Sequence, residues 1–299
     1  MQQTKKKVKK RYISHLFKSY NLMSNNEFLN KYLGEYFINS EFKQLLEEGL
    51  YRLRNILWGS PSDLFRNILI ETTSICNRKC SYCPVSKYPR KKAFMKKETV
   101  RKIIDELAEI NYRGKVCFHF FGEPLLDKRL EEFVKYTRDK LPKSKISIYS
   151  NGDFLTPELF LNLIKVGTSS FMITMHGTEW SKSMEETIKF VEENPEYKDY
   201  LNCITKLHLE NRGGLIKIDK VKKRKRCFDP IHAASVVYSG DVVLCCEDYF
   251  GNYRYGNVNN EKLMDIWNKE EFKRIRKECA KGIYKLDICK KCVGIKEDF

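Results

Sequence analysis

Short apolar, β-branched runs alternate with segments of helical period between residues 66 and 210. Five such runs predict strands, at 67–73, 115–121, 145–151, 169–177 and 202–210. Between them, apolar residues recur every three or four positions, which is the period of an amphipathic helix. Strands that alternate with helices at this spacing predict an α/β fold with a parallel sheet, either open or curled into a barrel.

The chain before this region has a different pattern. Six apolar residues fall on one helical face and predict an amphipathic helix: Phe42, Leu45, Leu46, Leu50, Leu53 and Leu57. We expect this apolar stripe to pack on the next domain, with a membrane-surface helix as the alternative. Gly59, Ser60 and Pro61 then mark a linker, so residues 1–65 are expected to form a basic, helical N-terminal extension.

The pattern changes again after Gly214. Seven of the ten residues from 217 to 226 are basic, and two short apolar runs around Gly240 predict a hairpin. A helix with an apolar face follows, formed by Leu263, Ile266, Trp267, Phe272 and Ile275. The sequence therefore predicts a main domain at 66–214 and a small domain, held by metal, at 215–299.

Composition indicates the cellular compartment of the protein and the kind of chemistry that its cysteines support. The chain has no long apolar run and no signal peptide, so we expect a soluble, cytoplasmic protein without a transmembrane segment. Eleven cysteines are too many for chance core packing and unsuited to disulfides in a reducing compartment, which indicates metal or redox chemistry. The formal charge of +17 suits an anionic partner. Nucleic acid is not expected, because no aromatic-rich strand of the RNA-binding type is present.

Three cysteines follow the first expected strand with the spacing Cys76-x3-Cys80-x2-Cys83. They lie on a loop at the carboxyl edge of the sheet, where α/β active sites form. A structural zinc needs a fourth ligand, and no cysteine or histidine occurs in the thirty residues after Cys83. A [4Fe-4S] cluster held by three thiolates instead leaves one iron open to a substrate or cofactor. The alternatives are a zinc site and a chance spacing of three cysteines.

This spacing, with the aromatic residue Tyr82, resembles the C-x3-C-x-aromatic-C signature of the radical S-adenosylmethionine (SAM) enzymes. The resemblance implies a partial barrel of five or six strand–helix units, with Tyr82 among the SAM contacts. In that family SAM chelates the unique iron of the cluster, and an electron from the cluster cleaves its sulfonium. The 5′-deoxyadenosyl radical that results abstracts hydrogen from substrate. A flavodoxin- or ferredoxin-type protein is the implied reductant.

Two further stretches resemble SAM-binding motifs of the family. FGEPL at 121–125 resembles the G-G-E-P stretch, with a phenylalanine in place of the first glycine, and implies that Gly122 and Glu123 hold the SAM amino group. Ser150 and Asn151 resemble the polar stretch that contacts the SAM ribose or carboxylate. A turn glycine with a solvated glutamate, and an ordinary Asn-Gly turn, are the alternatives.

A second set of cysteines lies near the carboxyl end: Cys227, Cys245, Cys289 and Cys292. The set resembles the SPASM or twitch extension of radical SAM enzymes, whose full pattern has seven cysteines and two clusters. Only seven residues follow Cys292, so the later ligands are absent. The resemblance implies one fully ligated auxiliary [4Fe-4S] cluster, suited to electron transfer or structure. A zinc held by four thiolates is the alternative.

Three residues near the expected site are candidates for catalysis. Cys246 follows a cluster ligand and is expected to face the other side of the hairpin, where it could donate a hydrogen atom, as a cysteine does in an epimerase of the family. His176, at the end of the fourth strand, is a candidate proton shuttle or substrate contact. Arg212 could hold an anionic substrate or act as a base. The alternatives are an inert thiol for Cys246, a loop histidine for His176 and a surface charge for Arg212. Three other cysteines we interpret as packing residues: Cys117, Cys203 and Cys279.

The single-auxiliary arrangement resembles, within the family, a dehydrogenase that oxidises an amino-cyclitol alcohol and a related sugar epimerase. We therefore expect dehydrogenation or epimerisation of a sugar- or cyclitol-type small molecule. In the dehydrogenase, hydrogen abstraction gives a ketyl-type radical that loses a proton and passes its second electron to the auxiliary cluster. A peptide-modifying maturase is the alternative within the family. A basic RNA-binding or zinc-stabilised module is the alternative outside it.

Overall fold

The computed structural model describes residues 49–53, 55–56, 63–207, 209–219, 221 and 223–295. The chain forms two compact units, Met1–Leu64 and Phe65–Phe299. In the first unit, residues 49–53 and 55–56 are helical, as the amphipathic pattern predicts. The rest of that predicted helix and the linker at 59–61 lie outside the described residues.

One sheet organises the second unit, with the strand order β5-β4-β3-β2-β1-β6-β7-β8. The strands are β1 (Asn67–Ile70), β2 (Lys115–Phe118), β3 (Lys145–Ser150), β4 (Ser170–Thr174), β5 (Leu201–Ile204), β6 (Ala233–Val236), β7 (Asp241–Val243) and β8 (Arg254–Asn257). The five predicted strands are present and parallel, although each is shorter than predicted. The sheet is open, with β5 and β8 at its edges.

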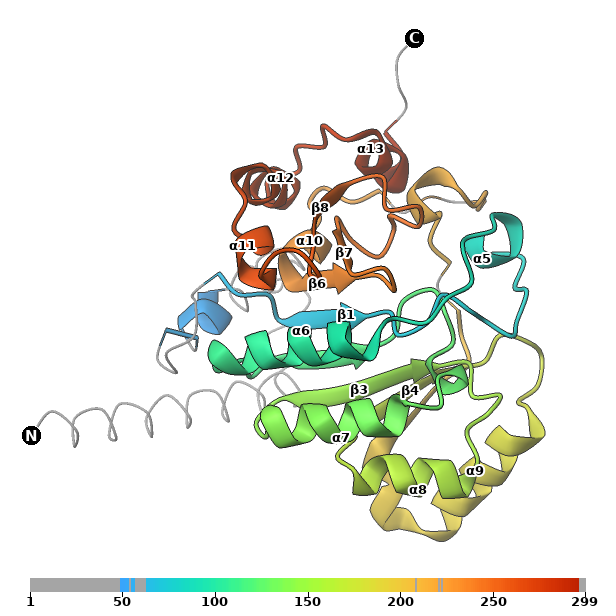
Figure 1. Cartoon of the computed structure of the whole chain (residues 1–299). Helices are drawn as coiled ribbons and strands as arrows, with labels where there is room; N and C mark the ends of the chain where they lie inside the picture. Colours follow the sequence, from blue (N-terminus) through green and yellow to red (C-terminus); the bar gives the residue numbers. More distant parts are fainter. Residues whose placement is uncertain are drawn as a thin grey trace, which may run out of the picture. The chain divides into compact units, whose positions relative to one another are not determined.

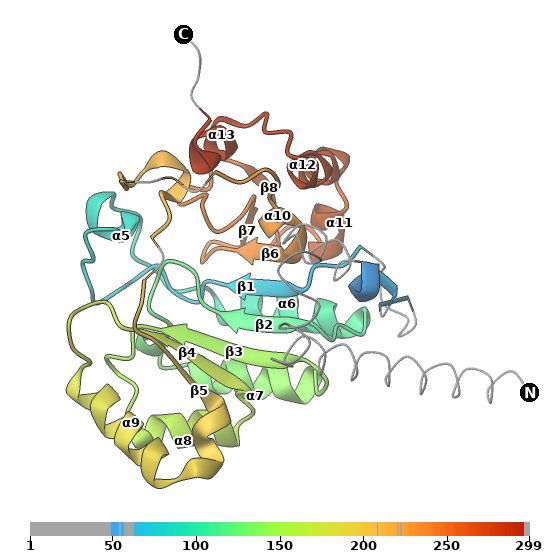
Figure 2. The same ribbon diagram turned by 180° about the vertical axis from the view of Figure 1, so that it is seen from behind.

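Helices α6 (Lys97–Glu109), α7 (Leu130–Lys140), α8 (Pro157–Lys165) and α9 (Lys182–Glu193) connect the parallel strands. They lie on one side of the sheet, as the front and back views show (Figures 1 and 2). Local signals set their ends. In α8, the Thr156 hydroxyl accepts a hydrogen bond from the Leu159 amide at 3.2 Å, and a proline occupies the first turn. A short 3-10 helix, η2 (Pro195–Tyr200), leads into β5.

The two faces of the parallel strands differ in chemistry. Phe171 of β4 packs on Phe160 of α8 with 4.9 Å between ring centroids, so its face of the sheet is the one that the helices cover. Ile148 pairs with Phe171 across the register, and like it is completely buried. The opposite face carries His119 and Tyr149, whose rings stack at 4.5 Å just beyond β2 and on β3. This second face is the polar one.

The carboxyl-terminal segment extends the same sheet. β6 pairs with β1 in parallel, and β7 and β8 follow as antiparallel strands, which confirms the predicted hairpin with its turn at Gly240 (φ +89°). The sheet therefore runs without a break across the expected domain boundary near residue 214, and that boundary remains a prediction.

Four short helices accompany these last strands: α10 (Asp229–His232), α11 (Leu263–Trp267), α12 (Glu270–Ala280) and α13 (Asp287–Val293). The prediction of one helix over residues 263–275 was wrong, because the segment is divided between α11 and α12. Arg276 of α12 stacks over the Trp267 ring at 3.7 Å and donates to the Trp267 carbonyl oxygen at 2.8 Å. This contact fixes the angle between the two helices.

Candidate active site

The three-cysteine loop leaves the carboxyl end of β1 and closes on itself before helix α5 (Pro84–Lys87). The Cys83 amide donates to the Cys80 carbonyl oxygen at 3.0 Å, and the Ser86 hydroxyl donates to the same oxygen at 2.5 Å. The thiols of Cys76, Cys80 and Cys83 are all partly exposed. Burial raises the pKa of Cys76 to about 11. Metal binding, which displaces the proton, is the chemistry such a thiol cluster suits.

Side chains from the loop after β3 anchor the cysteine loop. Arg78 makes a bidentate ion pair with Asp153 at 2.7 and 2.5 Å, and Asn77 donates to the same carboxylate at 2.6 Å. Asn151 in turn donates to the Asn77 side-chain oxygen at 2.9 Å. Burial disfavours ionisation of Asp153, but the bonds from Arg78 and Asn77 outweigh it and lower the pKa of that carboxyl. Sequence reasoning missed this anchor, because Arg78 and Asp153 are 75 positions apart.

The two stretches predicted to contact SAM meet at one carboxylate. Glu123 is 3% exposed and accepts hydrogen bonds from the Ser150 hydroxyl at 2.7 Å and from the Asn151 amide at 2.9 Å. Burial raises the pKa of Glu123 against the opposing effect of these bonds. Gly122 passes so close to the cysteine loop that a Cβ there would lie 1.9 Å from the Thr73 carbonyl oxygen. The contacts of these residues with SAM remain a prediction.

His176 lies over the cysteine loop. Its Nδ1 is 2.8 Å from the Tyr82 hydroxyl, and the two rings are 6.0 Å apart. Burial, followed by the positive charge of Arg78, lowers the pKa of His176. The neutral imidazole therefore predominates at neutral pH, which suits a hydrogen-bonding role beside Tyr82.

Arg212 and Glu247 form a second polar centre. The Arg212 guanidinium donates to Glu247 Oε1 at 3.0 Å, and Cys246 Sγ lies 3.8 Å from the same oxygen. Glu247 is 5% exposed, and its Oε2 has no hydrogen-bond partner among the described residues. Arg212 has the uncommon backbone angle φ +50° in the 3-10 turn η3 (Arg212–Gly214). The charge of Arg212 also acts on the Cys83 thiol, so this centre lies near the first cysteine set.

The pKa shifts of Arg212 and Glu247 indicate which of the two can accept a proton. Burial raises the pKa of Glu247, and the charge of Arg212 opposes that rise only in part. Burial alone would lower the pKa of Arg212, but the surrounding acidic groups, of which Glu247 has the largest effect, together raise that pKa. Arg212 is therefore a fixed cation. Glu247 is the better proton acceptor of the two, a role that the sequence did not indicate.

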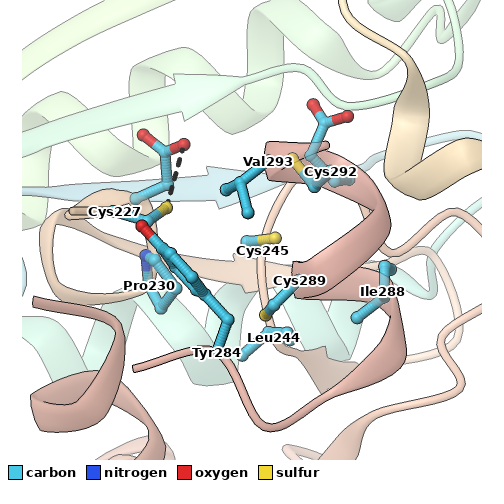
Figure 3. Close-up of a pocket in the computed structure, with 11 residues that line it drawn as sticks. Cys227, Pro230, Leu244, Cys245, Tyr284, Ile288, Cys289, Cys292 and Val293 are labelled. Atoms are coloured by element: carbon cyan, nitrogen blue, oxygen red, sulfur yellow. Dashed lines mark hydrogen bonds between the residues drawn. The ribbon is translucent and has the colours of Figure 1, made fainter. Parts of the chain in front are cut away.

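The second set of cysteines lines one cavity and comes from three segments of the chain (Figure 3). Cys227 precedes α10, Cys245 follows β7, and Cys289 and Cys292 lie one turn apart on α13. Apolar side chains, among them those of Leu244 and Ile288, make up most of the remaining lining, together with Tyr284 and the carboxylates Asp229 and Glu247. Four thiols around an apolar cavity fit a fully ligated [4Fe-4S] cluster.

The remaining cysteines divide into three cases. Cys117 is buried on β2, as the packing interpretation predicts. Cys203 is exposed, so the packing interpretation is wrong there, because β5 is an edge strand. Cys279 is buried, but its thiol is hydrogen-bonded to that of Cys289. This hydrogen bond and burial both raise the pKa of Cys289. Cys279 is thus a fifth thiol at the second cysteine set.

Comparison with known proteins decides the family. A model of the radical SAM superfamily matches residues 70–216, and a model of an iron-sulfur cluster-binding domain, SPASM, matches residues 227–293. An S-adenosyl-L-methionine-dependent 2-deoxy-scyllo-inosamine dehydrogenase of Niallia circulans is 34% identical over 236 residues, covering 78% of this chain and 94% of the relative. The chain belongs to the radical SAM enzymes.

Solved structures agree with this assignment. The crystal structure of BtrN in complex with AdoMet and 2-DOIA has a TM-score of 0.70 and 31% identity, covering 78% of this chain and 94% of that chain. AdoMet-bound anSMEcpe shares the fold at 15% identity and a TM-score of 0.53, covering 76% of this chain and 84% of its own. The cofactors are therefore SAM, a [4Fe-4S] cluster and an auxiliary iron–sulfur cluster. Among the described residues, no helix has the length and apolar character needed to cross a bilayer.

Proposed function

We propose that this radical SAM enzyme dehydrogenates a secondary alcohol of an amino-cyclitol or similar amino-polyol. The proposal rests chiefly on Glu247, a buried carboxylate with one unpartnered oxygen beside the fixed cation Arg212. An unpartnered buried oxygen is costly unless a ligand completes its hydrogen bonding, and a hydroxyl or ammonium group can do so. The relative and the BtrN complex named above support the substrate class.

Dehydrogenation removes two hydrogens from the alcohol, and the bound cofactors supply the radical hydrogen abstraction and the one-electron acceptor. The protein must take the hydroxyl proton. We assign that step to Glu247 Oε2, since its raised pKa makes the carboxylate a stronger base than a solvated glutamate. Arg212 has the opposite role. It holds Glu247 in place and stabilises a negative charge developing on the substrate oxygen.

Epimerisation is the second candidate, and Cys246 favours it. Its thiol lies 3.8 Å from Glu247 Oε1 and is therefore next to the same substrate position. A thiol can return a hydrogen atom to the opposite face of a substrate radical, which inverts a centre without net oxidation. Burial raises the pKa of Cys246 well above that of a free thiol and keeps its hydrogen in place.

The test begins with protein purified without oxygen and reconstituted with iron and sulfide. We would supply SAM, reductant and a panel of amino-cyclitols in deuterated water, and follow 5′-deoxyadenosine and products by mass spectrometry. The expected product is a ketone lacking two hydrogens. Glu247→Gln should lose at least about tenfold in ketone formation while still cleaving SAM, and Cys246→Ser should keep ketone formation.

Two outcomes would contradict the dehydrogenase. An epimer carrying solvent deuterium, absent with Cys246→Ser, would establish the epimerase instead. The absence of substrate-dependent 5′-deoxyadenosine with every amino-cyclitol would exclude this substrate class.

A further inference from the structure

Two basic segments lie side by side next to the auxiliary-cluster cavity. The backbone of residues 223–227 runs along residues 279–285: the Cys227 amide donates to the Cys279 carbonyl oxygen at 3.0 Å, and the Tyr284 hydroxyl donates to the Arg224 carbonyl oxygen at 3.2 Å. Gly282, at φ +79°, lies so close that a Cβ there would be 2.1 Å from the Lys225 carbonyl oxygen. These contacts hold the two segments at fixed positions.

Exposed lysines gather on this pair of segments, and we call them the lysine rim: Lys223, Lys225, Lys281 and Lys285. Ile283, at 45% exposure, lies among them. The nearby carboxylates already have partners: Glu278 is paired with Lys285 at 2.6 Å, and Glu210 and Asp229 are each paired with Arg224 at 2.8 Å. Within the part of the chain that the structure describes, Lys225 and Lys281 form no ion pair. The rim is therefore a net positive surface with an apolar residue inside it.

The segments that carry the lysine rim also contribute to the cavity of the second cysteine set. Tyr284, between Ile283 and Lys285 in sequence, lines the cavity of the second cysteine set, where Figure 3 shows it beside Cys227. Cys227, Cys289 and Cys292 are partly exposed, whereas Cys245 is buried. A cluster held there lies near the protein surface, within reach of electron exchange with a docked protein.

We propose that the lysine rim docks an acidic one-electron carrier protein that takes an electron from the auxiliary cluster. The inference rests on the proposed dehydrogenation. In that reaction one electron supplied by a reductant is consumed in cleaving SAM, and the alcohol gives up one hydrogen atom, one proton and one electron. The electron from the alcohol would therefore reach the auxiliary cluster once per turnover, and a docked carrier would provide its exit. The carrier gains that electron, and the cluster returns to its oxidised form. Small, charge-steered contacts are typical of electron-transfer complexes.

Nucleic acid fits this surface less well. Binding of single strands needs exposed aromatic faces on which bases stack. The aromatic residue here, Tyr284, faces the cavity and donates its hydroxyl to the backbone of Arg224. The exposed apolar residue is the aliphatic Ile283.

The test measures binding of oxidised, acidic flavodoxin to the full-length, cluster-loaded enzyme by calorimetry at low and high salt. The double variant Lys225→Glu with Lys281→Glu should weaken binding by at least about tenfold and reduce its salt dependence. The matched control is Lys182→Glu with Lys189→Glu on α9, which makes the same charge change at side chains 89% and 76% exposed. The control should bind flavodoxin as the unsubstituted enzyme does.

A second readout follows the electron. Cys76→Ala protein retains the auxiliary cluster alone; after photoreduction it is mixed with oxidised flavodoxin, and semiquinone formation is timed. The rate should fall with the rim double variant and not with the control. Equal binding by all proteins, equal losses in both double variants, or rim-dependent binding of single-stranded RNA without binding of flavodoxin would overturn the proposal. Ketone formation with dithionite, measured with the unsubstituted enzyme that carries both clusters, reports on the proposed function separately, and its absence would count against that function.

Discussion

At the scale of single residues, the site depends on close approach between loops that leave neighbouring strands. Gly122 lies in the loop after β2 and touches the backbone that leads into the cysteine loop. The amide of the next residue, Glu123, donates to the Ile75 carbonyl oxygen at 2.8 Å, directly before Cys76. A side chain at position 122 would therefore separate the Glu123 carboxylate from the cysteines.

We expect Gly122→Ala to destabilise the protein by about 1–3 kcal/mol, because its Cβ would lie 1.9 Å from the Thr73 carbonyl oxygen. Gly177→Ala is the matched control at the same edge of the sheet, since the nearest atom to its Cβ would be 3.7 Å away. Urea unfolding of the two apo-proteins measures the difference. Equal unfolding free energies of the two variants would show that the loop rearranges without loss of stability.

At the scale of elements, a buried ion pair joins the strand ends. Glu71 follows β1, is 1% exposed, and pairs with Arg90 at 2.5 Å. Its two oxygens also accept from the Phe121 amide after β2 at 3.3 Å and from the Tyr238 amide after β6 at 3.2 Å. The Arg90 guanidinium in turn lies 4.5 Å from the Tyr249 ring. One carboxylate therefore connects three strands and the chain that follows Cys245.

Removing one partner leaves the other as an unpaired buried charge. We expect Glu71→Gln to cost about 3–5 kcal/mol of unfolding free energy. Adding Arg90→Met to it should recover part of that loss, because the unpaired cation is then gone. Asp139→Asn is the control: it breaks an exposed pair with Lys135 at 3.0 Å and should cost less than about 1 kcal/mol. A full double-mutant cycle in denaturant gives the coupling energy, and a value near zero would refute the role of the pair.

At the scale of the whole molecule, the sequence pattern predicted those features of the fold that short stretches of the chain determine. The five parallel strands, the hairpin at Gly240 and the grouping of Cys227 with Cys245, Cys289 and Cys292 were all indicated by short-range pattern or by motif spacing. The pairing of β6 with β1 was not, because strand neighbours more than 160 residues apart leave no local signal. The roles of Arg78 and Glu247 were missed for the same reason: their partners, Asp153 and Arg212, come from distant loops.

The pairing of β6 with β1 crosses the expected domain boundary near residue 214. β6 supplies the whole outer edge of β1, from Asn67 with Ala233 to Ile70 with Val236, and Phe65 packs on Trp267 of α11 with 5.0 Å between ring centroids. A fragment of residues 65–214 would therefore expose an unpaired strand edge and a large apolar surface.

We expect the 65–214 fragment to aggregate or to unfold without a cooperative transition, whereas residues 65–295 should unfold in one transition. Size-exclusion chromatography and thermal unfolding followed by circular dichroism compare the two in the apo form, which removes any contribution from iron. A monomeric fragment with its own cooperative transition would show that the main domain folds alone and that β6 only docks on it. The single transition expected here would mean that both cysteine sets depend on one folding unit.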